Sequence, residues 1–126
     1  KGATTGTTIA GGKGKGNNAD QLISPMSIWV DGNGDMYIAE GGTVHRIKHW
    51  QKNKTEGEVI IGGNTAGAGA TLLNSPGNAV LDANGNLFVS DMNNFRVQRF
   101  SVVDSVYSIN PTSVGAYTVQ AQTFGG

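Results

Sequence analysis

An internal repeat is the feature that most limits what this chain can fold into. The run Ile9–Gly12 (Ile-Ala-Gly-Gly) returns as Ile60–Gly63 (Ile-Ile-Gly-Gly), an offset of 51 residues. The same offset aligns Ser24-Pro25 with Ser75-Pro76. Self-similarity at such a period predicts stacked structural repeats. The match continues along the chain. Asp31–Gly34 aligns with Asp82–Gly85, and Met36–Glu40 aligns with Leu87–Asp91. After a one-residue shift, His45–Ile47 aligns with Phe95–Val97.

Each unit carries strand signals separated by turns. Short runs rich in β-branched and aromatic residues alternate with clusters of Gly, Asn and Asp, which is typical of an all-β chain. Asp-Gly-Asn-Gly and Asp-Ala-Asn-Gly predict hairpin turns, because Asn and Gly tolerate positive φ. The predicted inner strands are Ser27–Val30, Met36–Ala39 and Val44–Trp50 in the first unit, and Asn78–Leu81, Leu87–Ser90 and Phe95–Val102 in the second. Outer strands are predicted at Thr7–Ala10, Glu58–Ile61 and Tyr117–Phe124.

Four strands in a unit of this length are typical of a β-propeller blade. One blade cannot bury both of its faces, whereas stacked blades cover one another. We therefore predict an all-β fold of two blades of four antiparallel strands plus an extra outer strand, as part of a larger ring. The predicted units are residues 1–57 and 58–126, the second with a longer loop around Ser105–Gly115. The outer strand Thr7–Ala10 has no inner strands of its own and implies a partner at the N-terminal end.

Composition excludes several function classes. The nine basic and nine acidic residues cancel, so the basic excess of a nucleic-acid binder is missing. The absence of cysteine excludes disulfides and thiolate metal sites, and no apolar run is long enough to span a membrane. We expect no nucleic-acid partner and no membrane span. The lysines form two small basic spots, which we interpret as solvated loop residues: Lys1, Lys13 and Lys15, and Lys48, Lys52 and Lys54.

The second unit, from Leu73 to Phe100, resembles an NHL repeat. That family has a Pro-led first strand, an Asp with a turn Gly, then "Leu-Tyr-Val-Ala-Asp" and "Asn-His-Arg-Val". The first unit is similar but has Glu40-Gly41-Gly42 where Asp and a short Asn-containing turn are usual, and the second has Phe95 where His is usual. The resemblance covers about residues 7 to 102. It implies a six-bladed propeller, an architecture found in intracellular RNA- or protein-binding proteins, secreted proteins and lyase-type enzymes.

Two segments resemble ligand loops only superficially. Gly12–Gly16 has the glycines of a phosphate loop but no helix to hold the phosphate, so we predict a loop between blades. Asp31, Asn33 and Asp35 resemble the start of a calcium loop. The sixth and twelfth positions of that loop fail to match, so we predict a hairpin turn.

The histidines and tryptophans are interpreted as packing or surface residues. His45 and His49 share one face of a predicted strand, with no third metal ligand beside them in sequence. Trp29 and Trp50 align with Val80 and Phe100, and we expect both to pack. We identify no catalytic, cofactor-binding or metal-ligating residue and expect no cofactor.

Asn53-Lys54-Thr55 is an N-glycosylation sequon in a polar loop between two strands. We treat Asn53 as the candidate modification site. The leading hypothesis is a noncatalytic structural or interaction module, extracellular, whose partners are further propeller blades or copies of the same chain, with an N-glycan at Asn53. The alternatives are a fragment of a propeller enzyme of the lyase or lactonase type, or an intracellular protein- or RNA-binding propeller.

Overall fold

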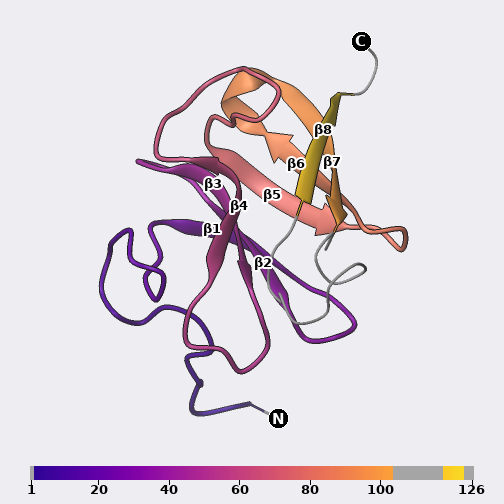
Figure 1. The fold of residues 1–126 in the computed structure, drawn as a ribbon. Coiled ribbons are helices and arrows are strands. Elements are labelled where there is room, and N and C mark those ends of the chain that lie inside the picture. The colour runs from indigo at the N-terminus through magenta and orange to yellow at the C-terminus, as the bar shows by residue number, and fades with distance from the viewer. Residues whose placement is uncertain (1, 104–117, 124–126) are drawn as a thin grey trace.

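The computed structural model describes residues 2–103 and 118–123, which form two four-stranded antiparallel sheets (Figure 1). The strand order is β1-β2-β3-β4 in the first sheet, here called blade 1, and β5-β6-β7-β8 in the second, blade 2. The all-β prediction is confirmed. The elements are β1 Pro25–Val30, β2 Met36–Glu40, β3 His45–Trp50, β4 Glu58–Gly63, β5 Pro76–Leu81, β6 Asn86–Asp91, the 3₁₀ turn η1 Met92–Asn94, β7 Arg96–Val103 and β8 Thr118–Thr123.

Side-chain hydrogen bonds of an aspartate close the first hairpin of each blade. In blade 1, the Asp31 carboxylate accepts from the backbone amides of Asn33 and Asp35, at 2.9 and 3.0 Å. Gly34 has a φ of 86°, which glycine adopts without steric cost. Asp82 accepts from the amides of Asn84 and Asn86 in the same way. The predicted hairpin turns are therefore present in both units.

The Ser-Pro pairs mark an irregular entry into each first strand. Ser24 and Ser75 have φ values of 45° and 52°, a conformation that a non-glycine residue seldom adopts. The register of the first strand then shifts directly after Pro25 and after Pro76. Each pair thus turns the incoming loop into the sheet through a β-bulge.

The two blades pack face to face around one apolar core. Alternation along a strand places one set of side chains on this interblade face and the other set on the opposite face. The core joins Tyr37, Ala39, Ile47 and Ile61 of blade 1 to Leu73, Ala79, Leu87, Val89 and Phe100 of blade 2. Trp50 is buried on the other side of blade 1 with Met36 and Ile38.

Methionine and glycine have exchanged places between the blades. A Cβ added to Gly41 would lie 3.2 Å from Met26 on the paired strand β1. In blade 2 the methionine is on the other side of the pair, because a Cβ added to Gly77 would lie 3.0 Å from Met92. In each blade one methionine packs against a glycine, and a side chain at that glycine would require the methionine to shift.

The predicted outer strand Thr7–Ala10 does not form, and that prediction is wrong. As an outer strand it would pair with the third strand of a blade, and the two such strands among the described residues, β3 and β7, already pair with β4 and β8. Instead, Ala10 packs against the apolar cluster on the far side of blade 1, while Ile9 is 62% exposed.

Two further expectations concern the boundaries of the units. Glu58–Gly63, the first element of the predicted second unit, is the fourth strand of blade 1, so a sequence unit and a blade are offset by one strand. The outer strand of blade 2 is present as β8, and the predicted loop around Ser105–Gly115 lies outside the described residues.

Candidate functional site

A buried carboxylate–arginine pair fastens the incoming loop to blade 1. Glu40 ends β2 and is fully buried, and Arg46 holds it through two hydrogen bonds of 2.9 and 3.0 Å. The same carboxylate accepts from the backbone amide of Ile23 at 2.6 Å. Arg46 also donates to the Asn17 side chain at 2.9 Å. Both charges are thus satisfied by structural contacts.

Blade 2 repeats this arrangement with the shorter carboxylate Asp91. Arg96 donates to it at 2.8 Å, and the Asn74 amide donates to it at 2.6 Å. The other guanidinium nitrogens donate to carbonyls of Ala68, Gly69 and Leu72 in the loop that leads into the blade. The "Asp" and "Arg" of the repeat motif therefore fix the loop between blades.

Lys48 does not belong to a surface basic spot, which corrects the sequence interpretation. Its side chain is buried and its ammonium donates to the carbonyls of Asn18 and Gln21, at 3.2 and 2.7 Å. Burial lowers the pKa of Lys48 below its ordinary value, although the Glu40 charge acts in the opposite direction. Alternation on β3 placed Lys48 in the sheet, but sequence alone gave no sign that the loop would fold over it.

The two histidines serve different contacts. His45 Nδ1 accepts from the backbone amide of Ser75 at 2.9 Å, which ties β3 to the entry of blade 2. His49 is buried, with Nε2 3.1 Å from Asp35 and Nδ1 3.7 Å from Glu58, and its ring centroid is 4.9 Å from that of Tyr37. Across the described parts of the chain, no three His, Asp or Glu side chains gather as a metal site.

Tyr37 lies in the same buried region. Burial, followed by the charges of Asp31 and Asp35, raises its pKa to about 12. The phenol is therefore held neutral at physiological pH. The two aspartates of the superficially calcium-like loop are engaged here with backbone amides and His49.

The two tryptophans differ in burial. Trp50 is buried and its indole nitrogen donates to the carbonyl of Lys54 at 2.8 Å, which confirms its packing role. Trp29 lies on the same face of blade 1 as Tyr37, its β2 partner, but remains 38% exposed.

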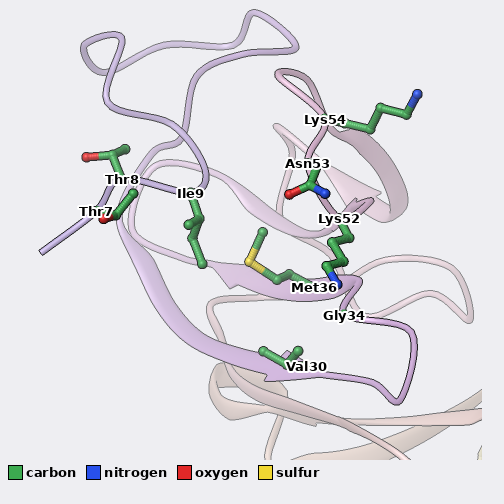
Figure 2. Close-up of a pocket in the computed structure, with 9 residues that line it drawn as sticks. All are labelled: Thr7, Thr8, Ile9, Val30, Gly34, Met36, Lys52, Asn53 and Lys54. Atoms are coloured by element: carbon green, nitrogen blue, oxygen red, sulfur yellow. The ribbon is translucent and has the colours of Figure 1, made fainter.

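Asn53 lies on the exposed turn between β3 and β4. Its φ is 63°, and the turn is closed by the Lys54 amide donating to the Gln51 carbonyl at 3.1 Å. Asn53 lines the mouth of a cavity of about 480 Å³ between this turn and the N-terminal segment (Figure 2). In Figure 2, Ile9 points from that segment toward Met36, and Lys54 points away. The Asn53 amide is thus accessible.

The face of blade 1 that points away from blade 2 is apolar and incompletely covered. Ile28 on β1 is 52% exposed, and Met26 and Val30 are similarly open. A cavity of about 410 Å³ lies between these side chains and the N-terminal segment. We call this surface, made of Met26, Ile28, Val30, Met36 and Ile38, the free face of blade 1.

Blade 2 also has an apolar surface on its outward side. Strand alternation places Val80, Phe88 and Val97 opposite the interblade core. Beside them Phe95 is 95% exposed in a left-handed conformation with a φ of 54°, and Met92 is also exposed. We call the exposed side chains Val80, Met92, Phe95 and Val97 the free face of blade 2.

The repeat relates the two free faces to the interface inside the chain. The blade 2 side of the core corresponds, position by position, to the free face of blade 1. The corresponding pairs are Ala79 with Ile28, Leu81 with Val30, Leu87 with Met36, Val89 with Ile38, and Phe100 with Trp50. The chain therefore carries two unmatched halves of an interface that it also contains once in complete form.

Sequence reasoning did not identify these free faces as a site. The departure from the motif at Phe95 was a usable signal, because a large apolar residue replaces the histidine that contacts the neighbouring blade. The alternation of Met26, Ile28 and Val30 in β1 was another.

Comparison with known proteins gives a partial identification. No family model matches the chain. It is 34% identical over 92 residues to NHL repeat-containing protein 3 of Mus musculus, a match that covers 71% of this chain and 26% of the mouse protein. The chain therefore spans about a quarter of the length of this curated relative. Among the described residues, no helix is long and apolar enough to cross a membrane. The similarity points toward the NHL repeat proteins, in agreement with the motif of the second unit.

Proposed function

We propose that this chain is a two-blade segment of an NHL-type propeller that acts as a noncatalytic, extracellular interaction module. It assembles with further blades or with copies of itself. The observation that carries this proposal is the free face of blade 1, which repeats the blade 2 side of the interblade core and leaves Met26, Ile28 and Val30 exposed.

Burial of apolar area supports the assembly. Covering apolar surface contributes roughly 25 cal/mol per Å². In the core, Leu87 and Val89 are fully buried. Their counterparts Met36 and Ile38 are covered by Ala10 and Leu22, but the neighbouring β1 residue Ile28 is half exposed. A further blade would extend the same packing.

The local chemistry supports an interaction role over the lyase- or lactonase-type alternative. Glu40 and Asp91 are each held by an arginine and a backbone amide. The zero net charge gives no support to RNA binding.

The extracellular part of the proposal rests on the Asn53 sequon. Its exposed turn is compatible with access by a glycosyltransferase. Intact-mass analysis of native material should show a glycan that Asn53→Gln removes, with Asn33→Gln as the matched control outside a sequon. An unmodified Asn53 in secreted native material would contradict this part.

The assembly is tested by combining solution mass with binding of a dye that fluoresces on apolar surfaces. The chain should either sediment as an assembly or remain a monomer that binds the dye at its free faces. A folded 13.0 kDa monomer that binds no dye would overturn the proposal.

A further inference from the structure

We propose that the free face of blade 1 binds blade 2 of a second copy of this chain, with Phe95 of that copy seated beside Ser24 and Pro25. The inference rests on the proposed function and identifies the partner and the contact residues. Its template is the interface between blade 1 and blade 2 within one chain.

At that template interface, the turn after β2 meets the entry of the next blade. Gly41 approaches Pro76, because a Cβ at Gly41 would lie 3.8 Å from the Pro76 carbonyl oxygen. His45 accepts the Ser75 amide at 2.9 Å. The contact thus joins the turn that ends in a histidine to a Ser-Pro entry.

The same turn in blade 2 is larger and apolar. Met92 follows the buried carboxylate Asp91, as Gly41 follows Glu40. Phe95 precedes the pairing arginine Arg96, as His45 precedes Arg46. The junction beyond blade 2 therefore replaces a glycine and a hydrogen-bond acceptor with a methionine and a phenyl ring.

The receiving surface has matching chemistry. Ser24 and Pro25 form the corresponding entry of blade 1. Pro25, Leu22, Met26 and Ile28 line the 410 Å³ cavity, whose remaining wall includes Thr7–Ala10 of the N-terminal segment. These apolar side chains suit an aromatic anchor, since burying a ring in such a pocket contributes more than most single contacts.

The N-terminal segment must leave this face for the second copy to dock. Thr7–Ala10 occupies the place that the outer strand of a neighbouring blade would take, because it aligns with the β4 residues Glu58–Ile61. It forms no strand in the structure, and Ile9 remains 62% exposed. Ala10 of this segment packs on Met36, Ile38 and Trp50, whereas Ile9 buries little of its side chain.

The proposed contact is head-to-tail, so each chain uses one face as donor and the other as acceptor. Such a heterologous contact can repeat until a ring closes or a filament grows. Blocking one face should leave the other competent, which a contact of like faces would not allow.

The test compares single blocking variants with their mixture in analytical ultracentrifugation. Phe95→Glu blocks the blade 2 side, and Ile28→Glu blocks the blade 1 side. Ala83→Glu, at the exposed tip of the β5–β6 hairpin, is the charge-matched control. The parent chain and this control should sediment at twice the mass of one chain or more. Each blocked variant alone should be monomeric, and their equimolar mixture should form a dimer containing one of each.

A second variant guards against misfolding. Phe95→Asn removes the ring while suiting the left-handed backbone, so it should keep or raise the thermal midpoint while association is lost. A monomeric parent chain, or a blocked mixture that stays monomeric, would overturn the second-copy proposal. If that monomer still binds the apolar dye, the proposed function stands and the faces belong to blades of another source.

Discussion

The buried pair Glu40–Arg46 gives the sharpest test of how the repeat motif acts. Glu40→Ala would leave the Arg46 guanidinium, only 3% exposed, without its counter-charge and the Ile23 amide without its acceptor. Removing one partner of a buried pair costs about 3–5 kcal/mol. Domains of this size are stable by about 5–15 kcal/mol, so the variant should lose a large part of its stability.

Urea unfolding followed by circular dichroism measures this loss. With a slope of about 2 kcal/mol per M, the midpoint should fall by roughly 2 M. Glu40→Gln with Arg46→Met removes both charges and should recover part of the loss, because no uncompensated charge remains. A loss below about 1 kcal/mol for Glu40→Ala, the range of an exposed pair, would refute the reasoning.

Three further predictions concern single positions. Tyr37 has a pKa of about 12 in the folded chain against 10.0 ordinarily, so its contribution to stability should be complete below pH 10 and disappear as the pH rises to 12. Urea unfolding between pH 10 and 12 should show this decline in the free energy of unfolding. Tyr37→Phe should abolish the share of the decline that comes from ionisation of the Tyr37 phenol. Leu87→Ala, at a fully buried position in the interblade core, should cost about 2–5 kcal/mol in the same assay. A cost under about 1 kcal/mol would mean that the two blades do not pack as described. Gly62→Ala should destabilise by more than about 1 kcal/mol in thermal unfolding, since Gly62 has a φ of 74° and its added Cβ would collide with the His45 carbonyl. Gly63→Ala is the control. A Cβ added to Gly63 would have no atom within 4 Å, so this substitution should have a small effect on thermal unfolding.

The sequence was sufficient to predict two four-stranded antiparallel sheets, because the repeat and the alternation of residues along a strand are local signals. The hairpin turns at Asp31 and Asp82 and the order of strands in each blade follow directly from them. The strand predicted at Thr7–Ala10 did not form, because strand propensity does not say whether an inner strand is available to pair with. Here β4 had already taken the edge of β3.

The candidate site was less predictable for a different reason. A motif shows which residues recur but not which charges are buried. The sequence suggested that Lys48 is a solvated loop lysine. In the structure its ammonium donates to the carbonyls of Asn18 and Gln21 in the segment that covers it. Phe95 departs from the motif, which the sequence shows directly. Its counterpart His45 contacts the Ser75 amide of the next blade, whereas Phe95 is exposed, and only the structure shows this difference.

The exchange of methionine and glycine between the blades has a consequence for how the repeats diverged. Met26 faces Gly41, whereas Gly77 faces Met92, so each blade satisfies the same volume by opposite assignments. A single change from one assignment to the other passes through either an overfilled site or an empty one. The side chains at the two positions are therefore expected to vary together.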